Sequence, residues 1–427
     1  MYIYRMKRLT AILLWTICSF PLFLLAKDAK PTLLVYGAGI EAFVAAVQGA
    51  RSNVPTLWVV NDDPSFEDYT QSRISIASNH HLDSGIWLEL LTQVGGATKP
   101  SDSLAIAVKK DLNVRLLLNA MEKIIQQERN LTIVKNADIA SLQKNRNHWR
   151  VTLQNKNRYQ VRSIVDASAQ GRLQALLENG TTPSAKLRPI DQLTIEQTRT
   201  VVAVGAHHQT TYALCGADVL AQQTDNFFRV QPFIHAINDE EGIPLRAHIS
   251  QAIGAAAAYC SFFKTDAKHI DLRKWQTELI NFKARLFPWT NVTTESPHYM
   301  PLQKAYLATI FGEDDDHAKS EFTFGGNVQL ESIRGIFNQY YSRSQLWFID
   351  NTSTDFTLAD LLSFIKILAF RGDEIDAEVQ KEWNKKLNFE GEYNPDKVLS
   401  RLEFAVLIDR YANPFSKTIT MDGTIRR

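Results

Sequence analysis

Cysteine is scarce in this chain of 427 residues, which contains only Cys18, Cys215 and Cys260. Three cysteines are too few for a disulfide framework, and none of them has the C-x-x-C spacing of a zinc or redox site. The 10 histidines show no H-E-x-x-H or similar spacing, so we expect no metal site. For Cys215 and Cys260 we expect ordinary buried thiols, with a single disulfide as the alternative.

A surplus of charge of either sign is also lacking. The chain has 47 Lys and Arg residues against 46 Asp and Glu residues, which gives a formal net charge of +1. This balance provides no long-range field to attract nucleic acid, so we expect no nucleic-acid partner. Hydrophobic residues make up 45% and charged residues 22% of the chain, as is ordinary for a globular protein.

The N-terminus has the layout of a secretory signal peptide. Three basic residues between Arg5 and Arg8 precede an apolar run from about Leu9 to Ala26, and a cut after Ala26 would remove residues 1–26. We therefore expect an exported protein, periplasmic or extracellular, with no stable membrane span after removal of the leader. The alternative is an uncleaved anchor, because the run is close to the roughly 18 residues that a membrane span needs.

The stretch from Thr32 to Asn61 has the pattern of a strand, a glycine turn, a helix and a second strand. Leu33 to Val35 form a short apolar run, typical of a strand that is buried on both faces. The turn has G-x-G-x-x-A spacing, in which the glycines allow a tight turn and a close approach to a pyrophosphate, and the small third residue allows close helix packing. We expect this turn to bind a dinucleotide through Gly37, Ala38, Gly39, Ile40, Glu41 and Ala42.

The ribose of such a dinucleotide is usually bound by an acidic residue at the end of the second strand. At this place the chain has Asn61, followed by Asp62. An Asn side chain can hydrogen-bond a hydroxyl, but it lacks the charge that strengthens such a bond. We assign Asn61 and Asp62 to the ribose.

Further along, the sequence predicts a stretch of β-strands and then a helical region. Residues 130–142, 148–154 and 159–171 read as successive β segments, with apolar and polar residues alternating. After about Trp289 the pattern becomes helical. There Ser400 and Glu403 form a capping box that predicts the start of an amphipathic helix.

In their order, these motifs resemble the FAD-dependent oxidoreductases of the glutathione-reductase-like superfamily, and more narrowly the branch found in exported bacterial proteins. In that branch the glycine turn is followed by a helix like GIWLELL, a strand with an I-D-A-T-G-D-like end, a D-N-L-L-x-A-G-R-like segment and a helix rich in small residues. The corresponding segments here are 85–91, 165–171, 225–232 and 244–259. The resemblance covers about residues 32 to 285.

The resemblance implies an α/β fold, namely a Rossmann-like FAD-binding domain with an inserted β-rich substrate domain, plus a C-terminal helical region. The FAD-binding-like domain would span residues 27–288, and its β-rich insertion would lie at about 97–163 and 185–235. The helical region would span residues 289–427.

The resemblance also implies FAD as the cofactor. The residues expected on its flavin side are Asp166, Ala167, Ser168, Arg246 and Gly254. The loop that would face the flavin carries His80 and His81, which are candidates for proton transfer near neutral pH. For Gly254 and the alanines that follow it, tight packing of a core helix is an equally weighted alternative.

The chain departs from the family pattern in three places, the first being the loop at residues 69–85, which is glycine-rich in the family. The T-G-D of the family is replaced at residues 168–170 and its A-G-R at residues 230–232, so a carboxylate, a glycine and an arginine are missing. Each lost polar contact removes on the order of 1 to 3 kcal/mol of binding. We therefore weigh two functions: an exported FAD-dependent oxidoreductase, and a non-catalytic member of the same fold that has lost FAD and acts as a binding or scaffold protein.

The C-terminal helices carry a second, looser resemblance. Residues 393–395 together with the segment 400–410 resemble the small helical repeats related to S-layer homology modules. This resemblance implies contact with the cell envelope. The alternative, which we prefer, is a helical cap that buries apolar surface of the main domain.

Overall fold

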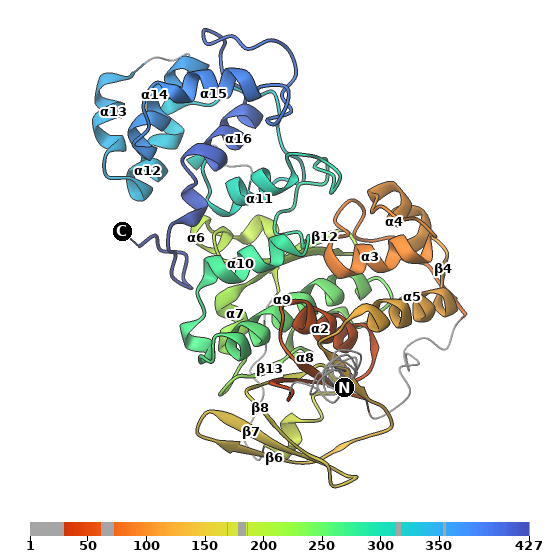
Figure 1. The fold of residues 1–427 in the computed structure, drawn as a ribbon. Helices are drawn as coiled ribbons and strands as arrows, with labels where there is room; N and C mark the ends of the chain where they lie inside the picture. The colour runs from red at the N-terminus through yellow and green to blue at the C-terminus, as the bar shows by residue number, and fades with distance from the viewer. Residues whose placement is uncertain are drawn as a thin grey trace, which may run out of the picture. The chain divides into compact units, whose positions relative to one another are not determined.

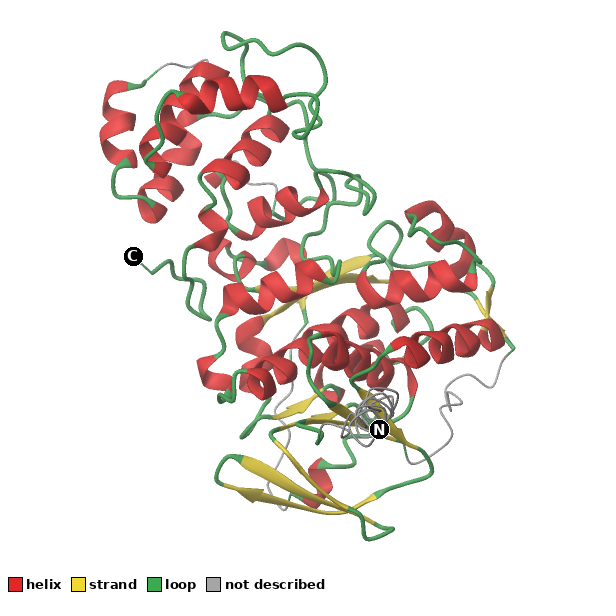
Figure 2. Ribbon diagram, viewed as in Figure 1, coloured by secondary structure: helices red, strands yellow, loops and turns green. Residues whose placement is uncertain are grey.

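The computed structural model describes residues 30–60, 72–168, 170–177, 185, 187–312, 317–352 and 356–426. Its main sheet is parallel and has the strand order β13-β9-β1-β2-β5 (Figures 1 and 2). Its strands are β1 (Leu33–Tyr36), β2 (Thr56–Val59), β5 (Leu131–Val134), β9 (Ser163–Asp166) and β13 (Phe227–Arg229). Two strands therefore lie on each side of β1, and the chain crosses from one side to the other between β5 and β9. This is the strand order of a Rossmann-like sheet, which confirms the predicted fold class.

The central strand β1 is buried along its whole length, because it has a strand on each edge, helices α2 (Gly39–Arg51) and α9 (Ile243–Phe262) on one face and the antiparallel strands of residues 139–161 on the other. Val35 pairs with Trp58 of β2 and with Val165 of β9. All four residues of β1 are buried, as the apolar run in the sequence predicts for a strand of a parallel sheet.

Helices α2 (Gly39–Arg51) and α9 (Ile243–Phe262) pack against each other beside this sheet (Figure 1). A Cβ added to Gly254 of α9 would lie 2.8 Å from the backbone oxygen of Ala45 in α2. Alanines 255 to 258 of α9 are also buried. The small residues therefore serve the close crossing of two core helices, which is the structural alternative that the sequence offered.

Residues 97–163, expected to belong to the β-rich insertion, contain helices as well as strands. Helices α4 (Asp102–Lys109) and α5 (Val114–Gln127) precede β5, which joins the main sheet. Only then does an antiparallel sheet of three strands follow (Figure 2). Its strands are β6 (Ile139–Asn145), β7 (His148–Leu153) and β8 (Arg158–Val161). Within residues 97–163 the antiparallel strands thus begin only at Ile139, and the bounds of the expected insertion stay a prediction.

Shorter elements complete the α/β part of the described chain. A small antiparallel sheet has the order β10-β12-β11, and helix α3 lies in the loop region after β2. These elements are β10 (Arg188–Pro189), β11 (Val201–His207), β12 (Thr210–Cys215), β3 (Arg73–Ile74), β4 (Leu112–Asn113), α3 (Gly85–Val94), α6 (Ile195–Thr198), α7 (Gly216–Ala221), α8 (Gln231–Ile234) and α10 (Leu272–Asn281). Cys215 and Cys260 are free and buried, which confirms the expectation of ordinary thiols.

The described residues after about 289 are helical, as expected. The helices are α11 (Tyr299–Leu307), α12 (Leu330–Tyr340), α13 (Ser344–Asp350), α14 (Leu358–Ala369), α15 (Glu374–Glu382) and α16 (Arg401–Tyr411). The capping box at the start of α16 is confirmed, because the Ser400 hydroxyl accepts from the Glu403 amide and the Glu403 carboxylate accepts from the Ser400 amide. These helices share one hydrophobic cluster with the α/β part.

Polar contacts also join the C-terminal region to the α/β part. Arg199, just before β11, donates from Nε to the Thr309 hydroxyl (3.0 Å) and from Nη1 to the Gly423 carbonyl (3.2 Å). Arg273 of α10 donates to the Leu307 carbonyl at 3.1 Å. Among the described helices, none is long and apolar enough to cross a membrane. The expected leader, residues 1–26, lies outside the described residues.

Candidate functional site

The site to which the sequence points lies at the carboxyl edge of the parallel sheet, between β1 and β9. In open α/β sheets, ligands bind outside the carboxyl ends of the strands where the strand order reverses. In this sheet the reversal falls at β1, since the chain builds β2 and β5 on one side and β9 and β13 on the other. Tyr36 and Asp166 are the paired last residues of β1 and β9.

The glycine turn leaves β1 at this edge and leads directly into α2. Gly37 has a φ of +132° and Gly39 a φ of +90°, conformations that residues with a Cβ rarely adopt. Ala38 is the N-cap residue of α2, and no side chain caps the helix there. The first-turn amides of a helix have no intrahelical acceptor and carry a partial positive charge. Ala38 and Gly39 are partly exposed, so an anion can approach this helix start.

The loop after β9 lies directly against the first glycine. A Cβ on Gly37 would lie 2.8 Å from the carbonyl carbon of Ala167 and 2.9 Å from the amide nitrogen of Ser168. The structure thus brings together three residues that the sequence assigns to the cofactor site. The close approach also explains the glycine, because any larger residue would push the two loops apart.

Asp166 directs its carboxylate into its own loop. Oδ1 accepts from the Ser168 amide (3.1 Å) and hydroxyl (2.5 Å), and Oδ2 accepts from the Leu173 amide (3.0 Å). The side chain is fully buried, and burial raises its pKa although these hydrogen bonds act in the opposite direction. Asp166 therefore shapes the loop that contacts Gly37.

Arg246 and Glu41 form a buried ion pair beside the turn. Arg246 Nη1 lies 3.0 Å from Glu41 Oε1, and both side chains are at least nine-tenths buried. Arg246 also donates to the Asn238 side-chain oxygen at 2.7 Å. Glu41 belongs to the first turn of α2, where a carboxylate is favoured by the helix dipole. The pair ties the start of α9 to the start of α2 and offsets the positive charge of Arg246.

Among the described residues, Gly254 does not join this group. Gly254 lies two turns further along α9 than Arg246, about 12 Å by helix rise, where it contacts Ala45. Asn61 and Asp62 lie outside the described residues. The assignment of these three residues to a cofactor therefore stays a prediction.

His80 and His81 are exposed in the loop before α3. Partial burial and the nearby Lys109 lower the pKa of His80, so its imidazole is neutral at pH 7. His81 has a φ of +58°, which is uncommon for a residue other than glycine. Their role in proton transfer stays a prediction.

Asp83 of the same loop forms a buried ion pair with Lys109 of α4, and neither residue is singled out by the sequence. Lys109 Nζ lies 2.5 Å from Asp83 Oδ2, and neither side chain is exposed. Lys109 also donates to the carbonyls of Ser78 and Asn79, and Asp83 Oδ1 accepts from Trp87 Nε1 at 2.8 Å. The spacing of Asp83 and Trp87 at i and i+4 is a weak signal of this contact.

Ser84 and His248 form a second buried pair. His248 Nδ1 donates to the Val204 carbonyl (2.8 Å), and its Nε2 lies 3.3 Å from the Ser84 hydroxyl oxygen. Burial lowers the pKa of His248 to about 4, so the neutral ring accepts the Ser84 proton. The Ser84 oxygen in turn accepts from the Arg285 amide at 3.0 Å. Because Ser84 is fully buried, this pair holds four segments together in the interior, away from solvent.

Similarity to known proteins is limited to about a third of the chain. No protein-family model matches the chain, and no curated protein matches it in sequence. Among solved structures, bacillithiol disulfide reductase Bdr (YpdA) from Staphylococcus aureus is similar over 33% of this chain and 38% of its own, with 16% identity and a TM-score of 0.24. Thioredoxin reductase from Streptococcus pyogenes MGAS5005 is similar over 34% and 36%, with 13% identity and a TM-score of 0.23. The OTEMO complex with FAD and NADP is similar over 33% and 26%, with 16% identity and a TM-score of 0.22.

Proposed function

We propose that this chain is an exported FAD-dependent oxidoreductase that holds the cofactor pyrophosphate at residues 37–42. One observation carries the proposal. At the point where the strand order reverses, two glycines of positive φ lead into the uncapped start of α2. This combination of a tight turn, free amides and an aligned helix dipole is the arrangement that binds a pyrophosphate in dinucleotide-binding folds.

The chain's own residues fit this role at the phosphate turn. The amides of Ala38 and Gly39 are at the exposed end of the turn, and Gly37 admits the backbone of Ala167 and Ser168. Bound FAD would supply the redox chemistry, while the protein supplies binding and orientation. Asn61 and Asp62 are proposed for the ribose, and His80 or His81 for moving a proton at the flavin side.

Two contacts favour the second candidate, a member of the same fold that has lost FAD and acts as a binding or scaffold protein. The Asp166 carboxylate is occupied by hydrogen bonds from its own loop. The positive charge of Arg246 is offset by Glu41 at the turn itself, which weakens its attraction for a phosphate. Both contacts reduce the number of polar side chains that could bind a cofactor.

Flavin content separates the two candidates. We expect the purified protein to be yellow, or to take up FAD after refolding with excess cofactor, and we expect Gly39→Trp to lose the flavin absorbance. Gly335→Trp is the matched control, because Gly335 is exposed on α12 with nothing within 4 Å of an added Cβ. A colourless wild-type protein that takes up no FAD would contradict the first candidate. Unchanged flavin in Gly39→Trp would contradict the assignment of the turn.

Export is a separate part of the proposal. We expect cleavage after Ala26, so that the mature chain begins at Lys27 and is found in the periplasm or outside the cell. The intact mass of the protein from the native host measures this directly, and a chain that retains residues 1–26 would instead support the anchored alternative. Contact with the cell envelope through residues 289–427 stays a proposal, and the contacts of Arg199 and Arg273 with this region favour its role as a helical cap.

A further inference from the structure

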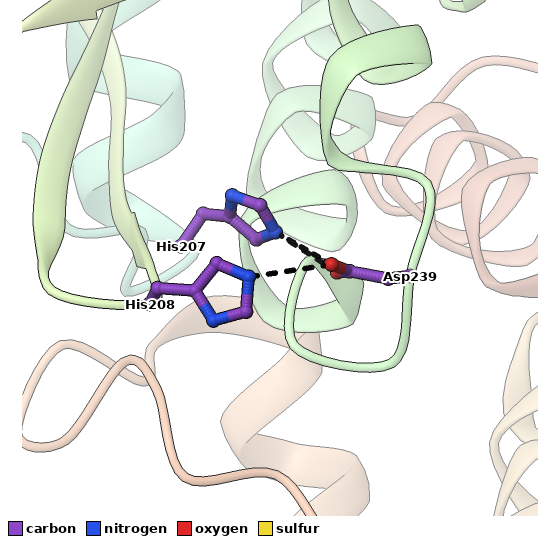
Figure 3. Close-up of side chains that lie close together, drawn as sticks. All are labelled: His207, His208 and Asp239. Atoms are coloured by element: carbon purple, nitrogen blue, oxygen red, sulfur yellow. Dashed lines mark hydrogen bonds and ion pairs between the residues drawn. The ribbon is translucent and has the colours of Figure 1, made fainter.

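Two adjacent histidines and one aspartate converge at the end of the β11–β12 hairpin (Figure 3). His207 is the last residue of β11 and His208 follows in the turn, whereas Asp239 lies in the segment before α9. His207 Nε2 lies 2.9 and 3.0 Å from the two Asp239 carboxylate oxygens. His208 Nε2 lies 3.4 Å from Asp239 Oδ2.

These separations are close to those within a metal coordination shell. The three ligand atoms all lie within 4.8 Å of one another. In a tetrahedral zinc site with bonds of about 2.0 to 2.2 Å, neighbouring ligand atoms are about 3.3 to 3.6 Å apart. An ion between the rings and the carboxylate therefore requires shifts of only a few tenths of an ångström for the His207 and Asp239 atoms, which side-chain rotation can provide.

The surroundings support a ligand role for the carboxylate. The Gly242 amide donates to Asp239 Oδ1 at 2.8 Å, and such a second hydrogen bond commonly orients a metal ligand. The side chains of His208 and Asp239 are 62% and 48% exposed. Water can therefore complete the coordination shell, and an ion has an open entry path from solvent.

We propose that His207, His208 and Asp239 form a binding site for a divalent transition ion, with Zn²⁺ as the best match. Two imidazoles with one carboxylate suit Zn²⁺, Ni²⁺ or Cu²⁺, whereas Mg²⁺ and Ca²⁺ prefer shells made of oxygen atoms. The bound ion joins the hairpin to the segment that leads into α9. The site is independent of whether the chain binds FAD.

Calorimetric titration of the full chain with zinc chloride, in protein that carries no added histidines, tests the site. We expect one ion bound per chain. His208→Ala, which removes an exposed side chain, and Asp239→Asn should each weaken the affinity by more than about tenfold. His269→Ala is the matched control, because His269 is also exposed but lies outside the cluster, and it should bind like the wild type. Magnesium chloride should give no binding heat.

Thermal unfolding provides a second measurement for variants that bind weakly. An ion that binds only the folded chain raises the midpoint by an amount that grows with the ratio of the free ion concentration to the dissociation constant. At one zinc concentration the midpoint should therefore rise equally for the wild type and His269→Ala and by less for His208→Ala. Circular dichroism checks that each variant is folded. The proposal is overturned if the wild type binds no zinc. It is also overturned if His208→Ala and Asp239→Asn both bind zinc with the same affinity as the wild type.

Discussion

Lys109 Nζ lies 2.5 Å from Asp83 Oδ2 in the interior of the protein. Lys109 is the last residue of α4 and Asp83 precedes α3, so the pair joins two segments next to the loop that carries His80 and His81. The lysine also donates to two backbone carbonyls, and Asp83 Oδ1 accepts from Trp87 Nε1. A charge left alone at this place would have no solvent to stabilise it.

Lys109→Met should therefore destabilise the protein by about 3 to 5 kcal/mol, the usual cost of breaking one side of a buried ion pair. The measurement is urea unfolding followed by circular dichroism. Lys110→Met is the matched control, because Lys110 is exposed at the next position, and it should change the free energy of unfolding by no more than about 0.5 kcal/mol. If Lys109→Met and Lys110→Met changed the free energy of unfolding equally, the buried ion pair would not contribute to stability as proposed.

Gly254→Ala should destabilise the protein although alanine normally stabilises a helix. The new Cβ would lie 2.8 to 2.9 Å from backbone atoms of Ala45, and forcing α9 away from α2 should cost about 1 to 3 kcal/mol. The control is Gly335→Ala in α12, where an added Cβ meets nothing within 4 Å, and this change should stabilise by about 0.5 to 1 kcal/mol. Thermal or urea unfolding of both variants shows whether each substitution raises or lowers the free energy of unfolding.

His248 should make the stability depend on pH between about 4 and 6.5. Its pKa is lowered from 6.5 to about 4 in the folded protein because the ring is buried. In this interval the unfolded chain binds the proton and the folded chain does not. The contribution of His248 to the free energy of unfolding is therefore fully present above pH 6.5 and is lost as the pH falls towards 4. The loss amounts to roughly 3 kcal/mol. Urea unfolding at pH 7 and pH 5 should show a smaller difference for His248→Gln than for the wild type, and an equal difference would argue against a buried neutral ring.

Ser400→Ala should remove one half of the capping box of α16. The Ser400 hydroxyl accepts from the Glu403 amide at 3.3 Å, and losing such a cap costs about 1 kcal/mol. Ser400→Asp should retain most of the stability, because aspartate is also a good N-cap residue. The free energy of unfolding measured for both variants tests this. If the alanine and aspartate variants were equally unstable, the hydroxyl would have a different role.

The sequence predicts the helices, strands and turns of this protein better than it predicts the partners of the polar side chains. The apolar run at Leu33 to Val35, the spacing of the glycines and the capping box each depend on neighbours within about six residues, and the structure has the expected strand, turn and helix start there. The partners of Asp166 also lie close in sequence. The resemblance nevertheless implies a role for Asp166 on the flavin side, which stays a prediction, because the sequence pattern does not show which way a carboxylate turns.

Residues whose partners are distant in sequence could not be predicted in this way. Lys109 ends a helix with many charged residues nearby, where a lysine normally points to solvent, yet its side chain is fully buried against Asp83. Gly254 fits a cofactor site and a helix crossing equally well until the position of Ala45 is known. The cluster of His207, His208 and Asp239 has no recognisable spacing, because its third member comes from a different segment.

The contact between Arg199 and Gly423 has a consequence for biosynthesis. The two residues are 224 positions apart, and the arginine is buried where it donates to the glycine carbonyl. At about 5 to 20 residues per second, a ribosome needs on the order of 10 to 45 s to make the intervening chain. Throughout that time the segment before β11 lacks this partner, so the interior around Arg199 can be completed only after residue 423 has been synthesised.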